Sequence, residues 1–204
     1  MIKQTFYNLQ EEKKRRILEA AKLEFSKVPL HDAKISNIVS TSKIPRGSFY
    51  QYFDTLNDVF IAMMQDIEQK KITILNQLVH KATGNIFKMA ILMFEHEYRY
   101  FKKMNHQLLL NIFKLSEMEE MYSQDVGTKF QDTNKMEFLN HLDFSGFNTL
   151  KQEEIFLIVQ MIFNILSEAV RISITKGYSL EMGERLFSKQ LEYIKYGVLN
   201  RKEA

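Results

Sequence analysis

The sequence has no cysteine, and only 2 prolines and 7 glycines among its 204 residues. Without cysteine the chain can form no disulfide, thiolate metal site, iron–sulfur cluster or cysteine nucleophile. The scarcity of proline and glycine argues against a turn-rich β-sandwich or barrel. Since 45% of the residues are hydrophobic and 26% are charged, we expect a globular protein built from long helices.

Long apolar runs are also missing. The segment Met1–Tyr7 lacks the apolar stretch of a secretory signal. The longest apolar run, Ile155 to Leu166, is interrupted by Gln160 and Asn164, and it falls short of the roughly 20 residues that cross a bilayer. We therefore expect no membrane span, no export and a cytoplasmic location.

Motifs of enzymes are absent from the sequence. It contains no Gly-rich phosphate loop, dinucleotide fingerprint, Gly-x-Ser-x-Gly elbow or His-Glu-x-x-His zinc helix, because Tyr100 stands where the motif starting at His96 needs its second histidine. The histidines His80, His106 and His141 are isolated in the sequence and are interpreted as structural residues. We predict that the protein is not an enzyme, with no catalytic residue, no metal site and no cofactor.

Positive charge is concentrated at the N-terminus. Residues 1–53 contain ten Lys and Arg and five Asp and Glu, a net charge of +5, whereas the rest of the chain carries −2. A small basic region joined to a nearly neutral one is typical of proteins that bind polyanions such as nucleic acids. A solvated helix face explains the charge equally well.

Helical periodicity runs through the N-terminal region. Asn8, with Glu11 three positions later, has the pattern of a capping box and predicts a first helix over about residues 9–26. A fourth helix is predicted to begin after Thr55, with Asp58 in its first turn, and to continue to about residue 80.

Two short helices between these have the proportions of a helix-turn-helix. The first begins at Ile35 and ends before Lys43, and the second opens at Pro45. In such a unit the second helix enters the major groove and its N-terminal residues meet the base edges. The residues predicted to contact DNA are Ser36, Lys43, Arg46, Gly47, Ser48, Tyr50, Gln51 and Tyr52, whereas Phe49 and Phe53 are predicted to be core.

Four sequence blocks carry a family resemblance. They are Ile17-Leu18-Glu19-Ala20-Ala21 with Phe25, Ile35-Ser36-Asn37-Ile38-Val39, Arg46-Gly47-Ser48-Phe49-Tyr50-Gln51-Tyr52-Phe53, and Asp58-Val59-Phe60. Together they resemble the N-terminal signature of TetR/AcrR-family transcriptional regulators, over roughly residues 3–60. The resemblance implies an all-α fold of about nine helices. It also implies a helix-turn-helix DNA-binding domain at 1–54 and a larger helical effector-binding and dimerisation domain at 55–204.

Three positions depart from the family pattern. Lys43 replaces the usual glycine of the turn, which costs about 1 kcal/mol if the left-handed turn is kept. Pro45 replaces a Ser or Thr helix cap commonly worth about 1 kcal/mol. Leu56 replaces a lysine that members often place against a phosphate. These changes affect the expected DNA affinity more than the expected fold.

Two C-terminal helices have surplus apolar surface. The segment 153–175 is apolar except for one narrow polar stripe, and 180–199 is amphipathic. We expect a homodimer that joins these helices in a four-helix interface. The inward residues of the last helix are predicted to be Leu186, Phe187, Leu191, Ile194 and Val198.

The aromatic-rich remainder can enclose an apolar cavity for a small molecule. The residues predicted to line this effector pocket are Phe94, Tyr98, Phe101, Phe113, Met121, Tyr122, Phe163 and Asn164. The resemblance then implies a ligand-responsive regulator, by default a repressor, that binds a palindromic operator as a homodimer and is released by an apolar or amphipathic effector. The alternative is a helical small-molecule or partner-binding protein whose DNA-binding head has decayed.

Overall fold

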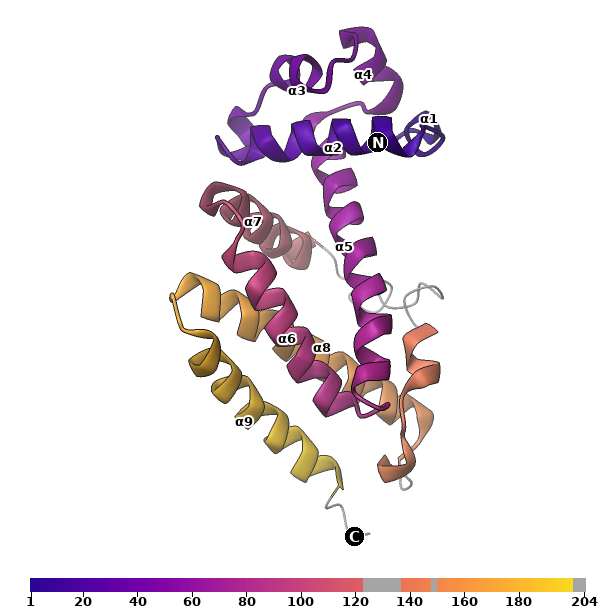
Figure 1. Cartoon of the computed structure of the whole chain (residues 1–204), viewed down its shortest axis with the longest axis vertical. Coiled ribbons are helices and arrows are strands. Elements are labelled where there is room, and N and C mark those ends of the chain that lie inside the picture. Colours follow the sequence, from indigo (N-terminus) through magenta and orange to yellow (C-terminus); the bar gives the residue numbers. More distant parts are fainter. Residues whose placement is uncertain (123–136, 148–149, 200–204) are drawn as a thin grey trace. The chain divides into compact units, whose positions relative to one another are not determined.

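The computed structural model of the chain describes residues 1–122, 137–147 and 150–199. Within these ranges the secondary structure is helical, apart from an isolated antiparallel bridge between Ile2 and Phe53 (Figure 1). The α-helices are α1 (Gln4–Tyr7), α2 (Glu11–Phe25), α3 (Ile35–Ser42), α4 (Arg46–Tyr52), α5 (Leu56–Lys81), α6 (Ile86–Lys102), α7 (His106–Tyr122), α8 (Gln152–Thr175) and α9 (Leu180–Leu199). Short 3-10 helices are η1 (Leu30–Asp32), η3 (Glu137–His141) and η4 (Ser145–Phe147). The predicted all-α fold class is confirmed.

The chain forms two compact units. The first, called the head unit, comprises Met1–Lys71 with Met104–Gln124, and the second, called the body unit, comprises Ile72–Lys103 with Asp125–Ala204. Helix α5 contributes residues to both. The domain boundary predicted after residue 54 falls inside the head unit, because the core of that unit also includes the first half of α5 and part of α7.

The core of the head unit forms from apolar residues at helical spacing. On α2 the buried face includes Ile17, Ala21 and Phe25, which recur every four residues, and the ring of Phe25 meets that of Phe60 on α5 at 5.1 Å between centroids. Helix α7 packs against α2 and adds Leu108, which is 1% exposed. The three-helix arrangement predicted for the N-terminus is thus completed by α5 and α7.

The predicted start of the first helix was wrong. Asn8 does not cap it, because the chain forms two helices there: Asn8 ends α1, its N–H donating to the carbonyl of Gln4 at 3.1 Å, and Gln10 precedes α2. A local capping-box pattern cannot exclude a preceding helical turn. This turn forms because Phe6, 4% exposed, is buried in the head core.

The predicted start of the fourth helix is confirmed. The Thr55 hydroxyl accepts a hydrogen bond from the Asp58 N–H at 3.3 Å, and the Asp58 carboxylate accepts one from the Thr55 N–H at 2.8 Å. Burial raises the pKa of the Asp58 carboxyl, but hydrogen bonds from the Met1 amino group and from Thr55 outweigh burial, so the pKa is lowered from 3.8. The cap is therefore ionised at neutral pH.

The body unit is built on three helices that pack against one another, α6, α8 and α9 (Figure 1). The predicted ranges 153–175 and 180–199 agree with α8 and α9. Phe187 and Leu191 point inward as predicted and Ile194 is partly buried, but Leu186 is 42% exposed, so its inward assignment was wrong. Adjacent residues of a helix point in different directions, so Leu186 lies beside the buried face that Phe187 occupies. Val198 lies outside the part of the chain whose side chains the structure describes.

Helix α8 is unusually apolar. Among the described residues it is the one helix that is long and apolar enough to span a membrane by length and hydropathy alone. We did not predict this from the sequence, because the apolar run from Ile155 to Leu166 is interrupted. Core helices of helical bundles meet the same criterion. On α8 one stripe, including Ile158, Ile162 and Leu166, is buried in the body core, and the helix packs against α6 and α9.

Gly183 allows α9 to approach its neighbours closely. A Cβ atom at this position would lie 2.6 Å from the Ser173 hydroxyl on α8 and 2.8 Å from the Phe94 ring on α6. We expect Gly183→Ala to lower the free energy of unfolding by about 1–3 kcal/mol, because close-packed neighbours must move. The matched control is Gly197→Ala on the same helix, where a Cβ meets nothing within 4 Å. Since alanine favours helix, this control should gain up to about 1 kcal/mol in urea denaturation. Equal effects of the two changes would contradict the close packing.

Candidate nucleic-acid interface

The turn between α3 and α4 has the geometry of a helix-turn-helix. Lys43 ends α3 in the left-handed region, with φ 55° and ψ 44°. The N–H of Lys43 donates to the carbonyl of Ser40 at 3.2 Å, and that of Ile44 to the carbonyl of Val39 at 3.1 Å. The left-handed turn expected from the sequence is thus formed with lysine in place of glycine.

This backbone conformation gives a stability prediction. Replacing Lys43 by glycine relieves the left-handed strain, so we expect Lys43→Gly to raise the free energy of unfolding by about 1 kcal/mol. Lys14→Gly in the interior of α2 is the control and should lower it by about 1 kcal/mol. Chemical denaturation measures both variants. A loss of stability in Lys43→Gly would mean that the lysine side chain contributes more than the turn strain costs.

Helix α4 presents one face to the core and another to solvent. Phe49 and Phe53 are fully buried, and their rings lie 5.5 Å apart, as predicted. The exposed face carries Arg46, Gly47 and Gln51, together with Tyr50, which is 42% exposed, and the partly exposed Ser48. A Cβ at Gly47 would meet nothing within 4 Å, so the backbone there is open to close approach from outside.

Tyr52 was wrongly assigned to this surface. It is 5% exposed, and the ammonium group of Lys13 lies 5.4 Å from the centroid of its ring. The physical reason is helical spacing, since Tyr52 follows Phe49 by three positions and shares its buried face. The same periodicity was present in the sequence and would have separated Tyr52 from Tyr50.

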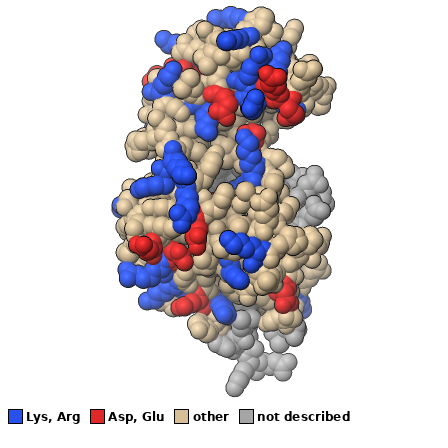
Figure 2. All heavy atoms as spheres, viewed as in Figure 1, with Lys and Arg blue, Asp and Glu red and all other residues tan. Residues whose placement is uncertain are grey.

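The remaining predicted contacts lie beside α4. Ser36 on α3 and Lys43 in the turn are both exposed. Leu56, which stands where the family pattern often has a lysine, packs against the core of the head unit. On the face that Figure 2 draws, Lys and Arg side chains are spread over much of the surface, with Asp and Glu side chains among them.

Glu24 positions α3, a role that sequence reasoning missed. Helix α3 has no side-chain cap of its own. The carboxylate of Glu24, at the end of α2 and 4% exposed, accepts a hydrogen bond from the N–H of Lys34 at 3.0 Å and from the amide of Asn37 at 2.9 Å. A negative charge at the N-terminal end of α3 is also favoured by the helix dipole. Glu24 and Lys34 are ten residues apart, a spacing that no capping motif has, so the sequence contains no local pattern that predicts this contact.

The residues predicted to line an effector pocket occupy different environments. Phe94 is fully buried and stacks on Phe187 at 5.3 Å, and the Tyr98 hydroxyl donates a hydrogen bond to the carbonyl of Tyr178 at 2.6 Å. Phe101 and Phe163 are partly buried against the body core, Asn164 is exposed, and Phe113 packs against the head core instead. The side chains of Met121 and Tyr122 lie outside the described residues. The effector pocket therefore stays a prediction.

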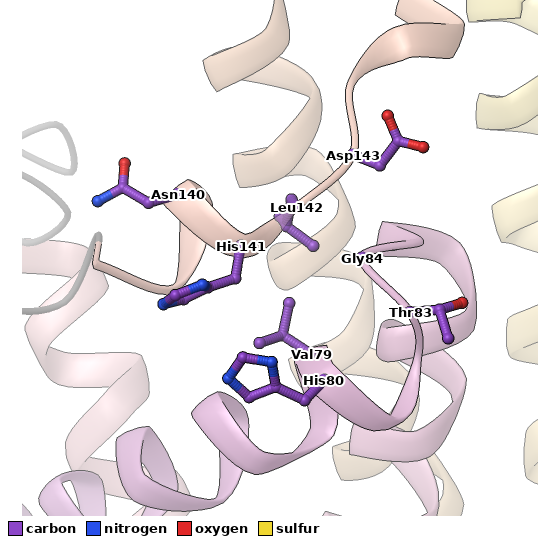
Figure 3. Close-up of a pocket in the computed structure, with 8 residues that line it drawn as sticks. All are labelled: Val79, His80, Thr83, Gly84, Asn140, His141, Leu142 and Asp143. Atoms are coloured by element: carbon purple, nitrogen blue, oxygen red, sulfur yellow. The ribbon is translucent and has the colours of Figure 1, made fainter.

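A pocket of about 300 Å³ lies elsewhere in the body unit, between the end of α5 with the turn that follows it and the end of η3 with the two residues after it (Figure 3). Its lining residues are Val79, His80, Thr83, Gly84, Asn140, His141, Leu142 and Asp143. His80 and His141, which are far apart in the sequence, are neighbours in space, with ring centroids 4.9 Å apart. The carboxylate of Asp143 points away from both rings, and its Oδ1 accepts the Ser145 N–H at 2.9 Å. Among the described residues no three His, Asp or Glu side chains are grouped to hold a metal ion.

Comparison with known proteins identifies relatives of this chain. No family model matches it. A 59-residue stretch, 29% of the chain, is 37% identical to the uncharacterized HTH-type transcriptional regulator YdgC of Bacillus subtilis, and this match spans 30% of the length of that relative. The structure of the fatty acid degradation regulator FadR from Bacillus halodurans matches 90% of the chain, with 19% identity and a TM-score of 0.57. A TetR family transcriptional regulator from Chloroflexus aurantiacus matches 97% of the chain, with 17% identity and a TM-score of 0.45.

These comparisons bear on the fold. The match to FadR covers 98% of that protein and includes both units of this chain. At such low sequence identity, shared function does not follow from shared fold. The chain shares the all-α fold of FadR, and its N-terminal sequence blocks had implied an all-α fold.

Proposed function

We propose that this protein is a cytoplasmic transcriptional regulator that binds double-stranded DNA as a homodimer, with α4 as its recognition helix. The observation that carries the proposal is the division of α4 into two faces. Phe49 and Phe53 fix the helix to the head core, while Arg46, Tyr50 and Gln51 remain exposed. These three polar side chains are not part of the buried core of the head unit, and their polar groups can form hydrogen bonds with base edges.

The dimensions of DNA agree with this arrangement. The major groove is wide enough to admit one α-helix, and the N-terminal residues of a recognition helix contact the bases. Arg46 is the first residue of α4 and can donate two parallel hydrogen bonds to guanine. Gly47 leaves the backbone open to close approach, and the exposed Ser36 and Lys43 can hold phosphates on either side.

The partner in the homodimer is proposed to cover α8 and α9. Large apolar side chains stay exposed on both helices: Leu157 is 56% and Met161 52% exposed on α8, and Tyr193 is 67% and Tyr196 60% exposed on α9. Exposed apolar patches of this kind commonly mark protein interfaces. Two-fold pairing of α8 and α9 makes one four-helix interface and gives the two recognition helices the symmetry of a palindromic operator.

A double substitution in this surface tests the dimer. Leu157→Glu with Met161→Glu buries four like charges across a two-fold interface, so we expect the dimer to dissociate at least tenfold more readily. Sedimentation velocity measures the change. Lys176→Glu, at the exposed end of the same helix, should leave the dimer intact. A stable dimer in the double variant would assign the interface to another surface.

Repression and release complete the proposed mechanism. A dimer on a promoter blocks polymerase, which makes repression the default output. A small apolar or amphipathic effector bound in the body unit releases the protein if it binds more tightly to a conformation that does not fit the operator. Helix α5 contributes to both units and is a continuous path for such a change.

The test is direct binding to DNA. Fluorescence anisotropy with duplexes flanking the gene of this protein should show submicromolar binding that weakens steeply with salt, because phosphate contacts release counterions. A scrambled duplex of equal length is the control. The alternative, a partner-binding protein with a decayed head, predicts equal and weak binding to both duplexes. Transcription from the bound promoter, with and without the protein, then distinguishes repression from activation.

A further inference from the structure

The last three carbonyl groups of α4 accept hydrogen bonds from one segment that is distant in the sequence. The ammonium group of Lys3 donates to the carbonyl of Tyr50 at 2.7 Å, the Thr5 hydroxyl donates to that of Gln51, and the main-chain N–H of Lys3 donates to that of Tyr52 at 2.9 Å. The last carbonyls of a helix normally lack partners within the helix. Here three consecutive carbonyls obtain partners from two residues that precede them by more than forty positions.

Helix α4 has few features of its own that favour a helical conformation. It is 7 residues long, and Pro45 at its N-terminal end makes no side-chain capping bond. Gly47 in its second position also disfavours helix. Isolated helices of fewer than about 12 residues are marginal in water, so this helix depends on contacts from outside itself.

We propose that residues 2–7, here called the strap, are a positioning element of the DNA-binding site, and that the capping of α4 by Lys3 and Thr5 sets DNA affinity. This inference rests on the proposed function. Contacts with Phe53 hold the strap in place both before Lys3 and after Thr5. Ile2 pairs with Phe53 in the antiparallel bridge, and the ring of Phe6 lies 4.7 Å from that of Phe53.

The position of Lys3 distinguishes this role from a direct contact with DNA. Its ammonium group bonds the C-terminal end of α4, where the helix dipole favours a cation, and forms an ion pair with Asp54 at 2.7 Å. Arg46 and the proposed base contacts begin at the opposite end of the same helix. Lys3 therefore acts on DNA through α4 and contributes no phosphate contact.

The test uses the variant Lys3→Met/Thr5→Val in the full chain. It removes the two side-chain donors, while valine keeps the shape of threonine and methionine keeps an unbranched side chain one atom shorter than that of lysine. We expect affinity for the duplex bound by the wild type to fall about tenfold, and the slope of log affinity against log salt to stay unchanged. Thr5→Ser, which keeps the hydroxyl, should retain wild-type affinity. Lys43→Met, which removes a proposed phosphate contact, should lower the slope by about one, and Lys27→Met is the control for loss of an exposed charge in the head unit.

Amide hydrogen exchange of residues 46–53 gives a second readout that needs no DNA. Exchange there should accelerate about tenfold in the double variant, while α3 and the body unit remain as protected as in the wild type. Unchanged protection of α4 would overturn the inference, as would unchanged affinity or a slope reduced by one. If the wild type binds no duplex, the proposed function fails, but faster exchange in α4 would still show that the strap holds the helix.

Discussion

Replacing Arg46 by alanine is expected to weaken binding to the preferred duplex by about 10- to 100-fold, which corresponds to about 1–3 kcal/mol for the loss of one good bidentate base contact. Arg46 is exposed at the first position of α4, and the buried Phe49 three residues later fixes the direction in which the helix points. Folding should not change, because Arg46 is exposed.

Fluorescence anisotropy over a series of duplexes with single base changes measures the effect. In Arg46→Ala, discrimination at one base pair of each half-site should disappear, whereas other positions remain selective. Arg16→Ala removes an equal charge from the exposed surface of α2 and is the matched control. A loss that is uniform over all duplexes would show that Arg46 holds a phosphate, and an unchanged affinity would mean that α4 is not the recognition helix.

The sequence predicted the helices whose signals are local. The ends of α3 and α5 followed from apolar spacing and from the Thr55 cap, and α8 and α9 from long amphipathic periods. The left-handed turn at Lys43 was expected from the family pattern alone, and it forms although lysine is disfavoured there. Tyr52 was assigned to the wrong face because its residue type was weighed above its spacing from Phe49.

The contacts that assemble the helix-turn-helix could not be predicted. Glu24 bonds the start of α3 and the strap bonds the end of α4, but neither contact lies at a spacing that any local motif defines. The close pair of His80 and His141 likewise depends on how the chain returns to the end of α5. Such contacts are determined by tertiary packing. It brings together side chains whose partners no local sequence pattern identifies.

Asn111 makes the most extensive of these unpredicted tertiary contacts, and its substitution has the largest expected loss of stability. This α7 residue is 4% exposed, and its side-chain amide donates to the carbonyl of Phe25 at 2.9 Å and to that of Val28 at 3.0 Å. Its carbonyl oxygen accepts the N–H of Leu30 at 3.2 Å. One side chain thereby satisfies three main-chain groups where α2 ends and the chain turns towards α3.

We expect Asn111→Leu to lower the free energy of unfolding of the head unit by about 3–5 kcal/mol, because leucine keeps the volume but leaves buried main-chain groups without partners. Urea denaturation followed by circular dichroism measures the loss. The control is Asn105→Ala directly before the same helix, where the exposed side chain accepts the N–H of Gln107 at 2.8 Å and removal of such a cap costs about 1 kcal/mol. A cost for Asn111→Leu no greater than that of the control would mean that water replaces the lost bonds. DNA affinity should fall together with stability, since the loop held by Asn111 leads into α3.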